Sequence, residues 1–131
     1  MSKKKIFIDG KAGTTGLRIE ERLSMRDDIE IVTLPDELRK DPIAKKEVLN
    51  QVDVAFLCLP DQAAIEAVSL VENPNVKIID TSTAHRVNEK WQYGFAEINN
   101  FEEKIANGSI KKLKRIIKRK ITKNVIKIFL L

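Results

Sequence analysis

Three glycines near the start of the chain have a spacing that suits phosphate binding. Gly10, Gly13 and Gly16 lie in the sequence GKAGTTG, a G-x-x-G-x-x-G arrangement instead of the commoner G-x-G-x-x-G. Such glycines let the backbone turn sharply off a strand, approach a pyrophosphate without a Cβ in the way, and aim helix N-terminal amides at its charge. Thr14 and Thr15 add two hydroxyl groups. A strand-to-helix turn without a ligand is the alternative, but the place of this loop after a first strand favours a dinucleotide.

The segment after the second expected strand bears on which dinucleotide would bind. Asp36 and Glu37 lie about 20 residues beyond the third glycine, where an acidic side chain holds the ribose 2'-hydroxyl of NAD. Arg39 and Lys40 follow directly and would instead suit the 2'-phosphate of NADP. A charged turn is also often merely solvated, so this segment by itself leaves both coenzymes open.

The elements that must position these residues alternate along the chain. The expected strands are apolar runs without period-2 alternation, which indicates a parallel sheet covered on both faces. Right-handed crossovers then bring the carboxyl ends of all the strands, and the polar residues that follow them, to one edge of the sheet. The sequence predicts strands at 4–9, 29–34, 52–59 and 76–80 and helices at 15–25, 42–50 and 62–72. The predicted fold is therefore α/β, an incomplete Rossmann-like doubly wound parallel sheet in residues 1–108.

Composition excludes several classes of protein. A chain of 131 residues with 43% hydrophobic residues forms one domain of ordinary size. One cysteine and one histidine leave neither a disulfide scaffold nor a zinc-ligand cluster, so no metal is expected. No apolar run approaches the ~18–20 residues of a membrane span, and the opening sequence MSKKKIFIDG does not resemble a signal peptide. We expect a cytoplasmic protein.

The net charge of +5 comes from a basic tail, residues 109–131. Residues 110–131 contain nine Lys or Arg and no acid, which leaves 15 basic against 19 acidic side chains in the rest. A basic amphipathic helix with Ile110, Leu113, Ile117 and Ile121 on one side would contact nucleic acid or an acidic membrane. A solvated helix docked on the sheet is a second interpretation. A shifted reading frame of AT-rich DNA, or a disordered segment, is the third, and the abrupt loss of acids, Ala and Gly favours it.

Four segments together are similar to a known family. IFIDGKAGTTGLRIEERL, VDVAFLCLPDQAA, IIDTSTAHR and the pattern W-x-Y-G-F-A-E resemble the N-terminal, NADP-binding part of N-acetyl-gamma-glutamyl-phosphate reductase in its shorter form, over roughly residues 4–106. The resemblance implies an enzyme of arginine biosynthesis whose cysteine thiolate attacks N-acetylglutamyl 5-phosphate, after which phosphate leaves and NADPH reduces the thioester to the semialdehyde. It also implies a small-molecule substrate and allows a homo-oligomer of the full-length enzyme.

The resemblance also assigns residues. Arg86 would be an anion clamp, because its planar fork suits a phosphate or a carboxylate, and the family tips the coenzyme toward NADP with Arg39 on the 2'-phosphate. NAD is not excluded. The implied coenzyme-binding residues are Gly10, Gly13, Thr14, Thr15, Gly16, Arg39, Leu59, Pro60 and Ser82, and the implied substrate-binding residues are Thr83, His85 and Arg86.

The sequence departs from the family at its nucleophile. The family's Pro-Gly-Cys motif and the second domain, with its histidine base, have no counterpart here; the chain reads Ala106-Asn107-Gly108-Ser109 instead, and Ala96 stands where the family usually has Pro. Cys58 is no substitute, since we expect it inside a buried strand as a small core residue. His85, the one histidine, would equally suit an exposed loop. We therefore expect no catalysis by this chain alone, and the alternative function is a free-standing dinucleotide-binding module whose tail binds a polyanion.

Overall fold

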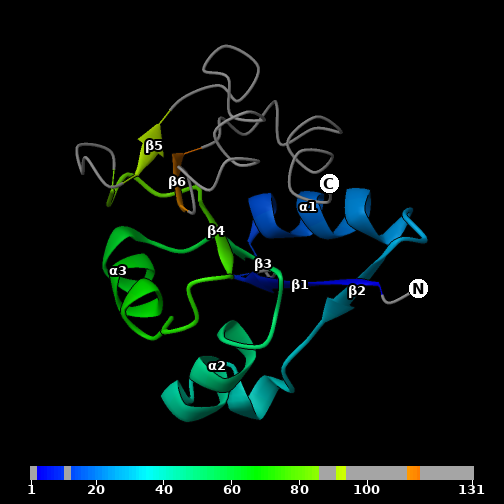
Figure 1. Ribbon diagram of the computed structural model, residues 1–131, viewed down its shortest axis with the longest axis horizontal. Helices are drawn as coiled ribbons and strands as arrows, with labels where there is room; N and C mark the ends of the chain where they lie inside the picture. Colours follow the sequence, from blue (N-terminus) through cyan, green and yellow to red (C-terminus); the bar gives the residue numbers. More distant parts are fainter. Residues whose placement is uncertain (1–2, 11–12, 86–90, 94–111, 116–131) are drawn as a thin grey trace.

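The computed structural model describes residues 3–10, 13–85, 91–93 and 112–115 (Figure 1). Strands and helices alternate from the start of the chain, as the apolar periodicity predicts. In chain order the elements are β1 (Lys4–Asp9), α1 (Thr14–Ser24), β2 (Ile29–Val32), the 3-10 helix η1 (Asp36–Leu38), α2 (Pro42–Leu49), β3 (Val54–Leu57), α3 (Asp61–Ser69), β4 (Lys77–Asp80), β5 (Gln92–Tyr93) and β6 (Lys112–Arg115).

The strands form one parallel sheet in the order β2-β1-β3-β4-β6-β5. Ile6 of β1 lies opposite Ile31 of β2 on one side and Val54 of β3 on the other. Because β2 and β3 add to opposite sides of β1, the order of the strands reverses there. That reversal leaves a crevice at the carboxyl ends of β1 and β3, the usual ligand site of an open α/β sheet.

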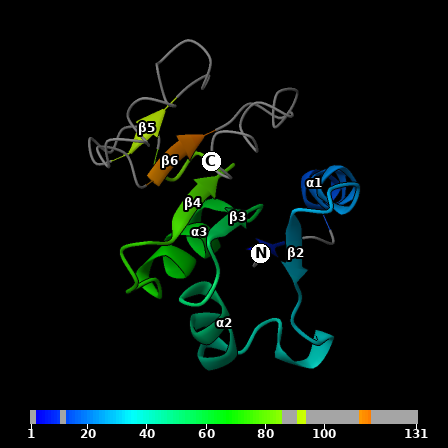
Figure 2. The same ribbon diagram turned by 45° about the vertical axis from the view of Figure 1, so that its right-hand side comes forward.

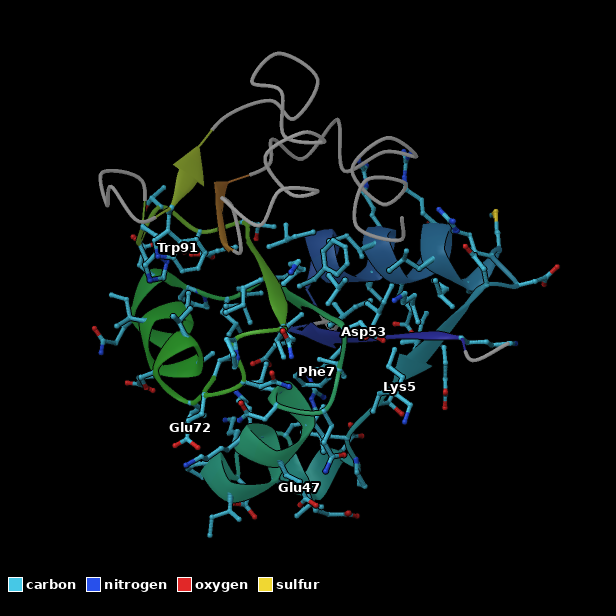
Figure 3. All side chains as sticks on the ribbon, in the orientation of Figure 1. Lys5, Phe7, Glu47, Asp53, Glu72 and Trp91 are labelled. Atoms are coloured by element: carbon cyan, nitrogen blue, oxygen red, sulfur yellow. The ribbon has the colours of Figure 1, made fainter. Side chains whose placement is uncertain are left out.

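Helices cover both faces of the sheet, as in a doubly wound fold. α1 lies on one face, and α2 and α3 lie on the other (Figures 1 and 2). Ile19 and Leu23 of α1 are buried, and Gly16 lies on the same stripe, as the helical spacing predicts. On the opposite face Phe7 points toward α2 (Figure 3) and packs in one cluster with Leu49 of α2 and Ala67 of α3.

Asn50, at the end of α2, fastens that helix to the segment after α3. Its side-chain oxygen accepts hydrogen bonds from the amides of Glu72 and Asn73 at 2.7 and 2.8 Å. Its side-chain nitrogen donates to the carbonyls of Lys46 and Leu70 at 2.8 and 2.9 Å. One amide side chain thus satisfies four backbone groups where two turns meet, which fixes the position of α2 under the sheet.

Two strands differ from the expectation. Gln92–Tyr93 form β5 beyond the last strand that the sequence predicts, and Lys112–Arg115 form β6 where one interpretation of the tail placed a helix. The physical reason is the open edge of β4, whose backbone groups need partners; β6 supplies them, with Ile79 opposite Leu113. The rest of the tail lies outside the described residues. The domain boundary at residue 108 stays a prediction.

Within the described residues, no helix combines the length and the apolar character that crossing a membrane requires.

Candidate functional site

The first glycine of the loop is required by a close approach of two strand ends. Gly10 follows β1 with φ +82°, and a Cβ at this position would lie 2.3 Å from the carbonyl oxygen of Cys58 and 3.2 Å from Cδ2 of Leu59. The Cys58 amide also donates to the Asp9 carbonyl at 2.9 Å. The crevice between β1 and β3 therefore admits only a residue without a side chain at position 10, as a sharp turn off the strand requires.

The second and third glycines open α1. The Gly13 amide donates to the Gly10 carbonyl at 3.1 Å, and Gly13 is the N-cap, without any side-chain cap. Leu17 makes the hydrogen bond to Gly13 that begins the helix, so the three amides before it have no acceptor within the helix. Lys11 and Ala12, and the side chains of Thr14 and Thr15, lie outside the described part of the chain.

The three α-helices differ in what faces their N-termini. The first turn of α1 contains no acidic residue, whereas Asp41 caps α2 through the amide of Ile43 at 2.9 Å, and Asp61 opens α3. The positive end of a helix dipole attracts anions, and at α2 and α3 a carboxylate of the chain already lies there. The start of α1 has no such carboxylate and is therefore the helix end best suited to a phosphate group.

A small pocket lies beside the glycine loop, at the ends of β1 and β2. Its volume is about 20 Å³, which holds one water-sized group. Arg39 lines it, and Arg39 Nη1 lies 3.2 Å from Asp36 Oδ1. Asp36, with 86% of its side chain exposed, is not among the lining residues, and Glu37 and Lys40 are also exposed. The lining residues are Phe7, Ile8, Asp9, Gly10, Thr33, Leu34 and Arg39.

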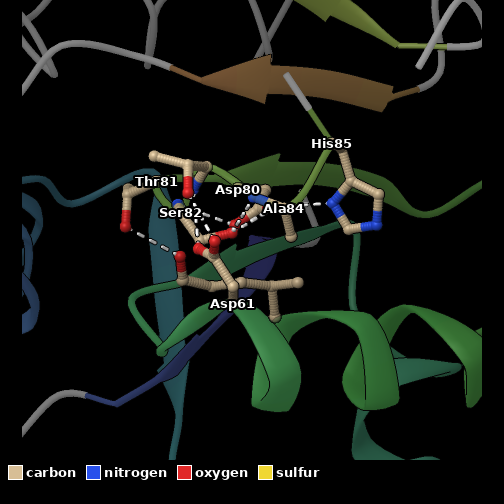
Figure 4. A network of polar contacts seen from close by, with 8 residues as sticks. Asp61, Asp80, Thr81, Ser82, Ala84 and His85 are labelled. Atoms are coloured by element: carbon tan, nitrogen blue, oxygen red, sulfur yellow. Dashed lines mark hydrogen bonds and ion pairs between the residues drawn. The ribbon is translucent and has the colours of Figure 1, made fainter. Parts of the chain in front are cut away.

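The loop after β4 folds around the carboxylate of Asp80 (Figure 4). Asp80 is fully buried and accepts hydrogen bonds from the amide and the hydroxyl of Ser82, both at 2.9 Å. His85 Nδ1 lies 2.6 Å from Asp80 Oδ2. His85 is 8% exposed and its ring stacks on Trp91, with centroids 4.1 Å apart. The prediction that His85 would equally suit an exposed loop is therefore wrong, because its ring is held in the interior by contacts with the buried Asp80 carboxylate and with Trp91.

A second carboxylate ties this loop to α3. The amide of Thr83 donates to Asp61 Oδ1 at 2.9 Å, and its hydroxyl donates to Asp61 Oδ2. The amide and hydroxyl of Thr81 both donate to the Leu57 carbonyl at 3.0 Å. The hydroxyl protons of Ser82 and Thr83 are thus donated to Asp80 and Asp61, so these two side chains can meet a ligand only as acceptors.

The sequence analysis gave Asp80, Asp61 and Trp91 no individual role, although Asp61 and Asp80 belong to the polar residues expected at the carboxyl edge of the sheet. One signal was available for Asp80: an Asp with a Ser two residues later is typical of a turn in which the carboxylate accepts the amide of that residue. Nothing local marks Asp61 or Trp91, since their partners lie elsewhere in the chain. Trp91 packs in the same cluster as Ala67 of α3 (Figure 3).

Leu59 and Pro60 follow β3 at the carboxyl edge of the sheet, and Cys58 lies elsewhere than expected. β3 ends at Leu57, so Cys58 is the first residue beyond the strand and is half-buried, not enclosed within it. The strand is shorter than expected because its last paired residue, Leu57, meets Asp9 and Asp80, where both neighbouring strands end. Arg86 lies outside the described residues.

The profile of the semialdehyde dehydrogenase NAD-binding domain matches residues 14–107. The chain belongs to this family. Curated relatives carry a narrower name: proteins called N-acetyl-gamma-glutamyl-phosphate reductase are 59% identical over 108 residues in Trichormus variabilis and 56% identical over 100 residues in Chelativorans sp.. These alignments cover 82% and 76% of this chain but 34% and 32% of the relatives, so this semialdehyde dehydrogenase NAD-binding domain spans about a third of their length. The resemblance seen in the motifs is confirmed.

Solved structures of aspartate semialdehyde dehydrogenases share the fold. An aspartate semialdehyde dehydrogenase from Francisella tularensis superposes with a TM-score of 0.63 at 18% identity, covering 84% of this chain and 36% of that one. An aspartate semialdehyde dehydrogenase with NADP from Candida albicans gives a TM-score of 0.57 at 15% identity, covering 86% and 42%. These likenesses confirm that this NAD-binding domain has the predicted Rossmann-like fold.

Proposed function

We propose that the chain is the coenzyme-binding part of an N-acetyl-gamma-glutamyl-phosphate reductase and that it binds NADP with the pyrophosphate on the N-terminus of α1. The observation that carries this proposal is the start of α1, where amides without helical acceptors adjoin a loop that admits no Cβ at Gly10. The names of the curated relatives support the choice of enzyme. The family description supports a nicotinamide dinucleotide as the ligand.

The pocket at the ends of β1 and β2 supports NADP over NAD. Thr33, directly after β2, and Arg39 line it, while Asp36 does not. A hydroxyl and a guanidinium suit a phosphate oxygen, and Arg binds phosphates through a fork of parallel N–H donors. At about 20 Å³ the pocket takes one oxygen of a 2'-phosphate, and the rest of that group would lie at its mouth beside Arg39.

The other end of the coenzyme would lie over the loop 81–85. When bound, the coenzyme supplies the hydride that reduces the substrate. Leu59 and Pro60 would flank its nicotinamide ribose, and the hydrogen bonds of Ser82 and Thr83 to Asp80 and Asp61 would hold the loop in one shape. We expect Ser82, Thr83 and His85 to act mainly by fixing this loop, which orients whatever group follows at Arg86.

The reaction itself requires more than this chain contains. The resemblance assigns the nucleophile to a Pro-Gly-Cys motif, and that sequence does not occur among these 131 residues. We expect the purified chain not to oxidise N-acetylglutamate semialdehyde in the presence of phosphate and NADP. Turnover above the blank by the purified chain would contradict this expectation. Binding of nucleic acid or an acidic membrane by the tail, and assembly into a homo-oligomer, stay predictions from the sequence.

The pyrophosphate site is tested by adding one charge at Gly13. In Gly13→Asp a carboxylate would cap α1, which stabilises a helix by roughly 0.3–1 kcal/mol, but it would repel a pyrophosphate. Gly13→Asn is the matched control, because Asn caps equally well without the charge. A side chain at position 13 would lie beside the pyrophosphate in both variants, so we expect both to bind NADPH more weakly than wild type. The added charge should make the NADPH affinity, measured by coenzyme fluorescence, at least about tenfold lower in Gly13→Asp than in Gly13→Asn. Equal affinities in the two variants would refute the placement of the pyrophosphate.

A second measurement needs no variant. Millimolar NADPH added to the folded chain should shift the amide resonances of Gly10, Gly13 and residues 14–16 and raise the unfolding midpoint, because a ligand of the native state stabilises it. If the chain is folded and neither change occurs, coenzyme binding is wrong.

A further inference from the structure

The pocket beside the glycine loop contains a buried carboxylate that the sequence analysis did not single out. Asp9 ends β1 and lines this pocket together with Gly10, Thr33 and Arg39. Its side chain is 10% exposed. Its Oδ2 is buried and accepts no hydrogen bond of good geometry from the described residues. A carboxylate in this position needs a compensating charge, since burying an unpaired ion is costly.

Lys45 of α2 supplies that charge. Its Nζ lies 3.0 Å from Asp9 Oδ2, and its side chain is 18% exposed. Lys45 belongs to α2, whose N-terminal capping by Asp41 and anchoring by Asn50 hold the helix against this face of the sheet. The ion pair therefore depends on the docking of α2, and it joins residues 36 positions apart in the sequence.

The charge balance of the pocket decides which ribose it accepts. The guanidinium of Arg39 already pairs with the carboxylate of Asp36. Among the described residues, Lys45 is the cation that pairs with the carboxylate of Asp9. A 2'-phosphate brings about 1.5 to 2 negative charges, so an unbalanced Asp9 would repel it at close range. A 2'-hydroxyl is neutral and can donate a hydrogen bond to a free carboxylate, which is how acidic residues select NAD.

We propose that Lys45 is a specificity-determining residue of this site: by pairing with Asp9 it lets the pocket accept the 2'-phosphate of NADP, and its removal turns the pocket toward NAD. The proposal rests on the proposed function, because it assumes that the pocket receives the 2' position of a bound dinucleotide. Lys45 would act on the coenzyme through the charge of Asp9 and not by direct contact.

The test compares NADPH and NADH affinities, by coenzyme fluorescence, in the whole chain and four variants. In Lys45→Met we expect NADPH to bind about tenfold or more weakly, and NADH to bind as in wild type or better. In the double variant Asp9→Asn/Lys45→Met, which removes both charges, NADPH affinity should return to within about threefold of wild type. Lys45→Arg keeps the charge and should keep NADPH binding. Lys46→Met is the matched control, since Lys46 follows Lys45 on α2 but pairs with Glu72.

The outcomes separate the two proposals. If wild type binds NADPH but Lys45→Met weakens both coenzymes equally, or the double variant does not recover NADPH, the role of Lys45 is wrong and the proposed function stands. If the folded wild-type chain binds neither coenzyme, the proposed function fails and this inference fails with it. Should Lys45→Met not fold, Asp9→Asn alone decides: it should strengthen NADPH binding more than NADH binding, and an equal change would overturn the proposal.

Discussion

Replacing Gly10 with alanine is the most direct test of the crevice between β1 and β3. Gly10 has φ +82°, and its missing Cβ leaves room for the Cys58 carbonyl, whose oxygen would lie 2.3 Å and carbon 2.9 Å from the added carbon. Both contacts are with backbone, so no side-chain rotation relieves them. To fit Ala, the ends of β1 and β3 must move apart.

Two costs set the size of the effect. A non-glycine residue in the left-handed region costs about 1–2 kcal/mol, and overpacking of a tight site costs about 1–3 kcal/mol. We therefore expect Gly10→Ala to lower the free energy of unfolding by about 2–5 kcal/mol. At roughly 4–8 °C per kcal/mol for a small domain, the unfolding midpoint should fall by at least ~8 °C.

The assay is thermal and urea unfolding followed by circular dichroism, with Gly13→Ala as the matched control. Gly13 has φ −79°, and an added Cβ would meet only the Gly10 carbonyl at 3.5 Å, an ordinary contact. That variant loses only the mild preference for Gly at a helix N-cap, about 0.5–1 kcal/mol. If the two variants unfold at the same midpoint, the close approach of Gly10 to Cys58 is not a feature of the protein in solution.

Three further predictions concern contacts away from the glycine loop. Asn50→Ala removes the partner of four backbone groups and should lower the free energy of unfolding by about 2–4 kcal/mol in urea titrations; a loss under 1 kcal/mol would contradict this. Trp91 is the one tryptophan, and its ring lies on His85, so His85→Ala should change its fluorescence yield or emission maximum; an unchanged spectrum would speak against the stack. The guanidinium of Arg26 hydrogen-bonds to Asp28 and holds the pKa of that carboxyl below its usual value. The small stabilisation from this pair is present above the unfolded-state pKa and is lost as the pH falls through the lowered one; NMR titration should find the low pKa and show it return to normal in Arg26→Gln.

Much of the site was predictable because its chemistry is local. The turn at Gly10, the cap of α2 at Asp41 and the buried stripe of Ile19 and Leu23 each depend on residues within a few positions of one another, so short stretches of sequence carry the signal for them. The position of His85 was not predictable in the same way. Its burial depends on Trp91 and on a carboxylate at the end of another element, and no spacing rule connects these three.

The lengths of the strands also depend on the tertiary structure. Residues 52–59 are apolar except for Asp53, and the sequence predicts a strand over all of them, but only Val54–Leu57 pair on both sides. Cys58 is left outside because the neighbouring strands end at Asp9 and Asp80. The position of β6 likewise depends on the open edge of β4, with which it pairs.

The amino-acid sequence by itself determined the alternation of strands and helices, the glycine turn and the family, since apolar periodicity, turn residues and motif spacing act over short stretches of chain. Only the tertiary structure decided that Gly10 meets the Cys58 carbonyl, that Asp80 holds Ser82 and His85, and that Lys45 balances Asp9. The physical reason is that burial and charge pairing depend on which distant residues the packed helices bring to one edge of the sheet.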